Sequence, residues 1–141
     1  MLLEPLGVAH NGVETIQVMG AVQEAGADRD PACVVQVAGH DVLVLGAGPI
    51  GLLAAQCAAA EGATRVILAD INPYRLELAA GMEVISCPLV TLDISSCDLA
   101  TEVKRLTGGA GVARLVEATG APPIVNSCFR WHHQQTVLGP I

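Results

Sequence analysis

The stretch Asp41-Val-Leu-Val-Leu-Gly-Ala-Gly-Pro-Ile-Gly51 joins an apolar run to a glycine-rich turn. The part that ends at Leu45 has the length and the continuous apolar character of a strand that is covered on both faces in a parallel sheet. The segment from Ile50 to Glu61 is rich in Ala and Leu, which favour helix, and Gly62 follows where a helix C-cap is expected. We therefore predict a strand, a tight turn and a helix in direct succession.

The rest of the chain repeats this alternation of short strand-like and longer helix-like segments. The further segments predicted are a strand Arg65–Ala69 ending at Asp70, a helix Tyr74–Ala80 opened by Asn72-Pro73, a strand Glu83–Cys87, a helix from an Asp98 N-cap to Leu106 that Gly108-Gly109 ends, a strand Val112–Glu117, a helix from Pro122 to about Trp131 and a strand Thr136–Leu138. Right-handed crossovers place the helices on both faces of such a sheet. The pattern predicts an α/β fold with a doubly wound parallel sheet, truncated at the C-terminus.

The composition limits the classes of function. The 141 residues allow one domain, and a hydrophobic share of 52% is enough for a core. Fourteen Asp and Glu against seven Lys and Arg give a net charge of -7, the opposite sign to a surface that neutralises phosphates. Aromatic residues make up 2% of the chain and offer little stacking on bases. We expect no nucleic-acid partner.

The cysteines and the hydropathy pattern indicate a cytoplasmic protein. The five cysteines are odd in number and never form a C-x-x-C pair, so we expect reduced, mostly buried thiols. The stretch 42–60 carries no charge, but glycines and Pro49 interrupt it before it reaches the length of a membrane span. The first residues show no basic region of a secretory signal. We expect no membrane association.

Gly46-Ala-Gly-Pro-Ile-Gly51 has the G-x-G-x-x-G spacing of a dinucleotide-binding turn. It lies between a predicted strand and a predicted helix, and the next strand ends in an acid, Asp70, 19 residues after Gly51. The first glycine permits the sharp turn, the second lets the backbone approach a pyrophosphate, and the third allows close packing of helix on strand. The helix N-terminus then presents N–H groups to the phosphates.

These features predict a Rossmann-type nucleotide-binding domain over residues 41–141, incomplete at its end. Residues 1–40 are predicted as a connecting helix, from Glu4 to about Ile16, followed by an irregular linker.

Asp70 bears on which dinucleotide is bound. At the end of the second strand, its carboxylate is placed to accept hydrogen bonds from both hydroxyls of an adenine ribose, where a 2′-phosphate would meet its negative charge. The pattern favours NAD over NADP, although Arg75 is placed to bond the ribose or to soften that repulsion. Two interpretations without a ligand stay open: the glycines form only a tight turn, or Asp70 is a helix N-cap in Asp70-Ile-Asn-Pro.

Four segments resemble one enzyme family. They are Leu3-Glu-Pro-Leu-Gly-Val-Ala9, Val42-Leu-Val-Leu-Gly-Ala-Gly-Pro-Ile-Gly51, Asp70-Ile-Asn-Pro-Tyr-Arg-Leu-Glu-Leu-Ala79 and Val116-Glu-Ala-Thr-Gly120. Together they resemble the zinc-dependent medium-chain alcohol dehydrogenases, and the first and third look closest to the polyol (sorbitol-type) and L-threonine 3-dehydrogenase branch. The resemblance covers the cofactor-binding domain only, preceded by the connecting helix.

The resemblance implies roles for particular residues. The cofactor it implies is NAD, contacted at the pyrophosphate by Gly46, Gly48, Pro49, Ile50 and Gly51, at the adenosine ribose by Asp70 and Arg75, and elsewhere by the backbone of Ala118, Thr119 and Gly120. Glu4 matches the acid that sits in or beside the zinc coordination sphere in this branch, and the competing interpretation is a solvated acid at a helix start. The implied activity is hydride transfer between a secondary alcohol, polyol or threonine-like, and NAD, in a homo-oligomeric enzyme.

The chain also departs from the family pattern. The family's catalytic cysteine, its His-Glu pair and its structural-zinc loop have no counterpart here, so the resemblance implies a catalytic zinc in a missing N-terminal domain. We assign no catalytic residue and expect this chain alone to be inactive. A metal site of Cys128 with His132-His133 is only weakly indicated, because adjacent histidines point in different directions on a helix. The alternatives left open are a non-catalytic NAD-binding module or inactive fragment, and an S-adenosylmethionine-dependent methyltransferase.

Overall fold

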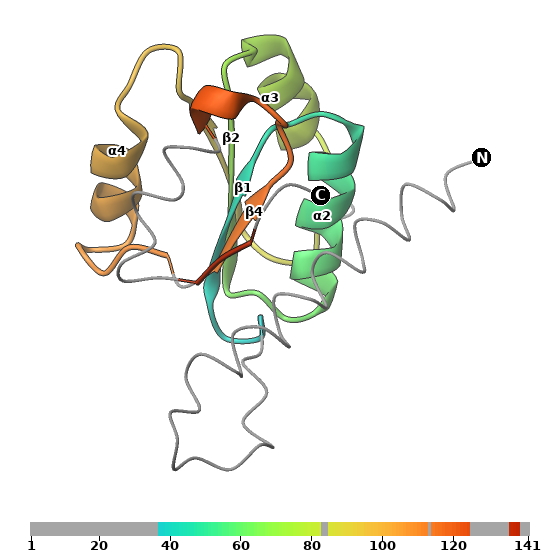
Figure 1. Cartoon of the computed structure of the whole chain (residues 1–141). Coiled ribbons are helices and arrows are strands. Elements are labelled where there is room, and N and C mark those ends of the chain that lie inside the picture. Colours follow the sequence, from blue (N-terminus) through green and yellow to red (C-terminus); the bar gives the residue numbers. More distant parts are fainter. Residues whose placement is uncertain (1–36, 83–84, 113, 125–135, 139–141) are drawn as a thin grey trace.

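A single parallel sheet forms the centre of the computed structural model, which describes residues 37–82, 85–112, 114–124 and 136–138 (Figure 1). Its strands are β1 (Asp41–Leu45), β2 (Arg65–Asp70), β3 (Leu89–Asp93), β4 (Arg114–Glu117) and β5 (Thr136–Leu138), and they lie in the order β3-β2-β1-β4-β5. The chain moves outwards from β1 to β3 and then returns to the other side of β1 with β4. In open α/β sheets, ligands bind at this switch point, beyond the carboxyl ends of the strands.

The strands β2, β1 and β4 end at the same level. Leu45 at the end of β1 pairs with Ala69 on one side and with Glu117 on the other. The ladder continues one step further, because Gly46 N donates to Ala69 O at 2.7 Å and Ala118 N donates to Leu45 O at 2.8 Å. The segments that follow the three strands therefore start side by side at one edge of the sheet.

Helices cover both faces of the sheet. The helices α2 (Pro49–Ala60) and α3 (Pro73–Ala80) lie on one face, and α4 (Leu99–Leu106) lies on the other (Figure 1). Because side chains alternate along a strand, β1, β2 and β4 each supply residues to both cores. The first core contains Val42, Val44, Val66, Leu68, Val116, Ala54, Ala55, Ala58, Leu76 and Ala79, and the second contains Leu43, Leu45, Ile67, Ala69, Leu92, Leu115 and Val103.

The predicted α/β fold with a Rossmann-type parallel sheet is confirmed, and most helices and strands agree within a few residues with the predicted ones. The predicted strand Glu83–Cys87 is wrong. Residues 85–87 form no strand, and β3 instead begins at Leu89, which pairs with Val66 of β2. Val66 N also donates to Pro88 O at 3.0 Å, so pairing with β2 sets where the strand lies.

Several predictions concern residues outside the described ranges. These are the helix from Glu4 to Ile16, the linker up to residue 36, and the part of the helix at Pro122 that extends beyond residue 124. Residues 122–124 themselves are helical. In the described part of the chain, every helix is too short or too polar to cross a membrane.

The described cysteines are less buried than the sequence predicts. All three are free thiols, but only Cys57 is buried, whereas Cys87 and Cys97 are half-buried. Burial raises the pKa of Cys57, and the charge of the nearby Glu61 raises it further. Burial also raises the pKa of Cys87 and of Cys97. Thiols of this kind stay protonated at neutral pH and are poor nucleophiles.

Candidate functional site

In the turn between β1 and α2, the first and the third glycine, Gly46 and Gly51, leave no room for a side chain. Gly46 has φ +98°, and a Cβ there would lie 3.0 Å from the backbone carbonyl of Ala118. A Cβ on Gly51 would lie 1.7 Å from Gly46 O, which no side chain can tolerate. These two glycines are therefore required by the turn itself, whether or not a ligand is bound.

The middle glycine, Gly48, is different because no residue in the described part of the chain requires a glycine there. Its φ of -75° suits any residue, and a Cβ there would meet no atom of residues 37–82, 85–112 or 114–124 within 4 Å. Gly48 is also the N-cap of α2, and no side chain caps this helix or places an acid in its first turn. The first turn of a helix leaves its N–H groups without intrahelical acceptors, and here Ile50 and Gly51 carry them, since Pro49 has none.

Asp70 ties this turn to β2. Its carboxylate is 6% exposed, with Oδ2 accepting from Ala47 N at 2.6 Å and Oδ1 accepting from Asn72 N at 2.8 Å. Arg75 Nη1 lies 3.8 Å from Oδ2, on a side chain that is 54% exposed. The interpretation of Asp70 as a helix N-cap is wrong: Asn72 caps α3, and its side chain accepts from Tyr74 N at 3.0 Å.

A second buried acid, Glu117, ends β4, and the sequence analysis did not assign it to the site. It is 1% exposed, and its Oε1 accepts from Thr119 N at 2.7 Å, from the Thr119 hydroxyl and from Gly120 N at 3.2 Å. The sequence did contain a pattern that could have indicated Glu117, because β2 and β3 also end in an acid, Asp70 and Asp93. Each of these three acids accepts the N–H of the residue two positions later.

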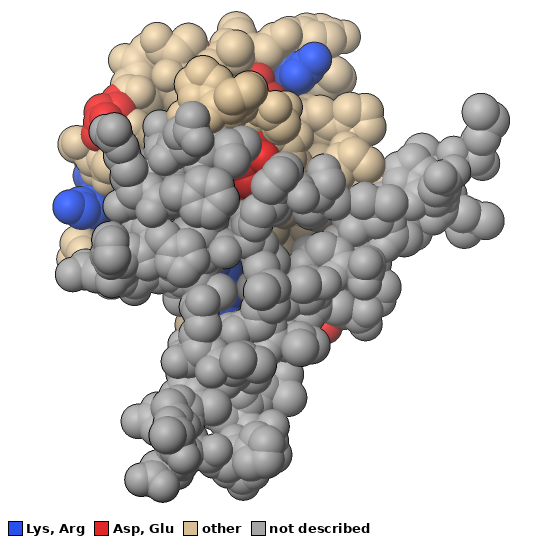
Figure 2. Space-filling view, in the orientation of Figure 1, with Lys and Arg blue, Asp and Glu red and all other residues tan. Residues whose placement is uncertain are grey.

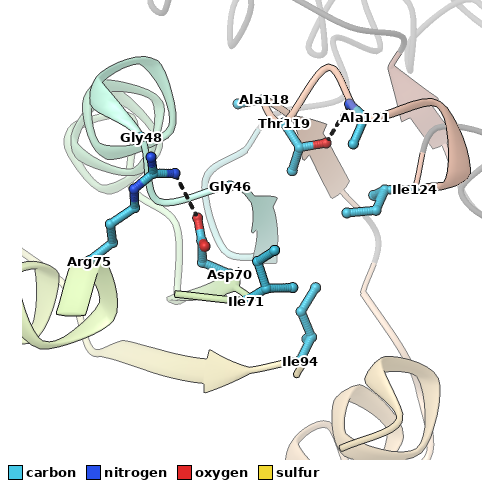
Figure 3. Close-up of a pocket in the computed structure, with 10 residues that line it drawn as sticks. All are labelled: Gly46, Gly48, Asp70, Ile71, Arg75, Ile94, Ala118, Thr119, Ala121 and Ile124. Carbon is cyan, nitrogen blue, oxygen red and sulfur yellow. Dashed lines mark hydrogen bonds and ion pairs between the residues drawn. The ribbon is translucent and has the colours of Figure 1, made fainter. Parts of the chain in front are cut away.

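These segments enclose a groove of about 230 Å³ at the carboxyl edge of the sheet. The residues that line it are Gly46, Gly48, Asp70, Ile71, Arg75, Ile94, Ala118, Thr119, Ala121 and Ile124. In Figure 3, the Asp70–Arg75 pair lies at one side of the groove and Thr119, Ala121 and Ile124 lie at the other. A charged side and an uncharged side therefore face one another across the groove.

The groove brings together six of the ten residues predicted to contact a cofactor: Gly46, Gly48, Asp70, Arg75, Ala118 and Thr119. The other four are adjacent in the chain, with Pro49, Ile50 and Gly51 in the first turn of α2 and Gly120 next to Thr119. Sequence reasoning missed the apolar lining residues. Ile71 and Ile94 each directly follow the acid that ends a strand, and this position could have indicated them.

Metal ligands are not gathered at this groove. Among the described residues, no group of three or more His, Cys, Asp or Glu side chains could hold a metal ion. Glu4, Cys128 and the pair His132-His133, which the sequence singled out, lie outside the described ranges. Figure 2 shows that the described part of the face in view is mostly uncharged, with Lys and Arg at separate points.

Comparisons with known proteins identify relatives for most of the chain. Residues 49–136 match the family of zinc-binding dehydrogenases. An alcohol dehydrogenase of Cupriavidus necator is 45% identical over 92 residues, which is 65% of this chain and 24% of that protein. An L-threonine 3-dehydrogenase of Alteromonas mediterranea is 43% identical over 84 residues, 60% of this chain and 24% of that protein. The chain spans about a quarter of the length of these curated relatives.

Solved structures give the same result. The benzyl alcohol dehydrogenase of Acinetobacter calcoaceticus superposes with a TM-score of 0.62 at 26% identity, over 99% of this chain and 34% of that one. The 2R,3R-butanediol dehydrogenase of Bacillus subtilis superposes with a TM-score of 0.56 at 27% identity, over 92% of this chain and 34% of that one. The resemblance predicted from the sequence is confirmed, and the chain belongs to the zinc-binding dehydrogenase family.

Proposed function

We propose that this chain binds NAD(H) in the groove at the carboxyl edge of the sheet, as the nucleotide-binding part of an alcohol dehydrogenase. One observation carries the proposal: the open Gly48, the uncapped N-terminus of α2 and the Asp70 carboxylate all border one groove. A helix N-terminus favours a phosphate, and a carboxylate at the end of the neighbouring strand favours ribose hydroxyls. The space that a Cβ on Gly48 would occupy lets a diphosphate approach the backbone closely.

Each residue then has a defined task. The N–H groups of Ile50 and Gly51 bind the pyrophosphate, and the absent side chain of Gly48 leaves room for it. The Asp70 carboxylate accepts from the ribose hydroxyls while its two backbone bonds keep it in place. Arg75 lies beside that carboxylate and is half exposed, so it is free to contact the ribose from outside. We propose 41–141 as the extent of the nucleotide-binding domain.

The proposed enzyme moves hydride between a secondary alcohol and NAD. Bound NAD would supply the hydride-accepting ring, and the chain's own residues bind and orient the cofactor. The side chains described here do not fit a zinc site, and the zinc that the family name implies is proposed to be held elsewhere in a longer, homo-oligomeric, cytoplasmic enzyme. We propose that this chain alone binds the cofactor without turnover. Family membership favours this function over a methyltransferase.

The test is a calorimetric titration of the full 141-residue chain with NADH, NADPH and S-adenosylmethionine. We expect NADH to bind more tightly than NADPH, because a 2′-phosphate would meet the Asp70 carboxylate. In Asp70→Asn, NADH binding weakens, and the ratio of the NADPH to the NADH dissociation constant falls by about tenfold or more. The ratio is the useful quantity, because Asp70 also holds Ala47 N and a loosened turn would weaken both cofactors alike.

The matched control is Glu77→Gln, which removes one negative charge from the exposed side of α3 without touching the groove. It should leave both dissociation constants unchanged. A wild-type chain that binds neither NADH nor NADPH, or that prefers S-adenosylmethionine, would contradict the proposal.

A further inference from the structure

Glu117 is a buried acid for which the proposed cofactor contacts provide no role. It is 1% exposed at the end of β4, and its second oxygen, Oε2, is buried without a hydrogen-bond partner among the described residues. Arg114, the buried cation of the same strand, lies three positions earlier and so faces the opposite side of the sheet. Burying a carboxylate is unfavourable unless its hydrogen bonds are made, so the three bonds on Oε1 are the ones that matter.

Those three bonds all go to the turn that directly follows β4. Oε1 accepts from the backbone N–H groups of Thr119 and Gly120 and from the Thr119 hydroxyl. The same hydroxyl accepts from Ala121 N at 3.0 Å. The chain of contacts thus runs from Glu117 through Thr119 to Ala121, and it fixes the turn around Gly120, whose φ is +62°.

The turn held in this way is one side of the groove. Ala118, Thr119 and Ala121 line it, opposite Asp70 in Figure 3. The turn also packs on the glycine-rich turn, since a Cβ on Gly46 would meet the Ala118 carbonyl at 3.0 Å and Thr119 Cγ2 at 3.1 Å. A shift of the turn would therefore narrow or widen the groove where it passes from β1 to β4.

We propose that Glu117 is a positioning residue: it sets the 118–121 side of the groove and so determines binding of the half of NAD(H) that lies beyond the pyrophosphate. The proposal rests on the proposed function. With the adenosine ribose at the end of β2 and the pyrophosphate at the end of β1, the remaining half of the dinucleotide reaches the end of β4, because the strands lie in the order β2-β1-β4. Glu117 itself touches no ligand and acts through Thr119 and its neighbours.

The experiment compares the affinity for NADH with that for AMP, which carries only the adenosine end. In Glu117→Met, which keeps the length of the side chain but loses the acceptors, we expect the NADH dissociation constant to rise about tenfold or more while that for AMP changes less than about threefold. Glu117→Gln keeps an acceptor oxygen, and we expect it to restore NADH binding to within about threefold of the wild type. A general loss of structure would weaken both ligands and would not be rescued by Gln.

A second pair of variants keeps the proposal falsifiable if Glu117→Met fails to fold. Thr119→Val removes the hydroxyl that links Glu117 to Ala121 N and should raise the NADH dissociation constant several-fold, with AMP unchanged. Thr107→Val is its control, because the Thr107 hydroxyl likewise donates and accepts hydrogen bonds, but away from the groove: it donates to Val103 O and accepts from Gly111 N. That variant should bind NADH like the wild type.

The outcomes separate the two proposals. If the wild-type chain binds neither NADH nor AMP, the proposed function fails. If the wild type binds both, but Glu117→Met and Thr119→Val keep wild-type NADH affinity or lose NADH and AMP equally, then the positioning role of Glu117 is wrong and the proposed function stands.

Discussion

The helices α2 and α4 both follow strands of the same parallel sheet, but they satisfy their first N–H groups in different ways. At α4 the Asp98 carboxylate accepts from Thr101 N at 2.9 Å, so the chain closes its own helix terminus. At α2 the cap is Gly48, which offers no side chain. The helix α3 resembles α4, with Asn72 as its cap. The difference indicates which terminus is available to an anion from outside and which ones only stabilise the fold.

The two helices also differ in burial, and the helix without a cap, α2, is the more buried one. Half of α2 is buried, mostly as small alanines that let it lie close to the sheet, whereas α4 buries only Val103. An uncapped terminus weakens a helix, and the packing of α2 offsets that loss. The more exposed α4 has a side-chain cap and an ion pair between Glu102 and Arg105, at 2.8 Å.

The largest effect is expected from Gly51→Ala, which tests whether the turn before α2 is a structural requirement. The added Cβ would lie 1.7 Å from Gly46 O, a backbone atom that cannot move without breaking the turn. We expect a loss of more than about 3 kcal/mol in the free energy of unfolding, or no folded protein. Urea denaturation measures it. Gly48→Ala is the control and should lose no more than about 1 kcal/mol, the cost of alanine at an N-cap, because its Cβ meets no described atom within 4 Å.

The next largest effect is expected on NADH binding, from a substitution that gives α2 a carboxylate cap like that of α4. Gly48→Asp places a carboxylate at an N-cap whose φ of -75° and ψ of 179° accept it without strain. We expect stability to stay equal or to rise by a few tenths of a kcal/mol, because the helix gains a cap. NADH affinity should fall more than about tenfold, because the new carboxylate occupies and repels the phosphate position. If the helix is stabilised and the NADH affinity is unchanged, then the N-terminus of α2 is not the place where the phosphate binds.

The smallest effect is a difference between the caps of α3 and α4 in how their contribution to stability depends on pH. The backbone N–H of Thr101, and then its hydroxyl, lower the pKa of Asp98, so its contribution to stability is present above the unfolded value of about 3.9 and is lost as the pH falls through the lower folded value. Asp98→Ala should therefore lower the melting temperature at pH 7, and the loss should be smaller once the pH is below both values, because the wild-type carboxylate has then lost its charge.

Asn72→Ala is the matched comparison, since an amide does not titrate in this range. It should cost about 1 kcal/mol at every pH where the protein is folded. Neither cap variant should change NADH affinity at pH 7. An Asp98→Ala effect of the same size at low pH as at pH 7 would show that the carboxylate charge contributes nothing to the cap of α4.

The sequence predicted the elements whose signals are local. The turn from Gly46 to Gly51, the cap at Asp98 and the last strand, Thr136–Leu138, were predicted because each depends on residues close together in the chain. The strand β3 was predicted too early, at Glu83–Cys87, because only Leu92 of its five residues is buried and its apolar pattern is weak. Its place follows from pairing with β2, 23 residues earlier for the pair Val66 and Leu89.

The sequence by itself determined the fold class and the position of the glycine-rich turn between β1 and α2, because apolar periodicity and glycine spacing act over a few residues. Only the tertiary structure decided what the two buried acids do. Asp70 reaches Ala47 N across 23 residues, and the turn that Glu117 holds meets Gly46 only because β1 and β4 are neighbours in the sheet. A contact between segments far apart in the chain depends on how the strands are ordered, and no local pattern encodes that order.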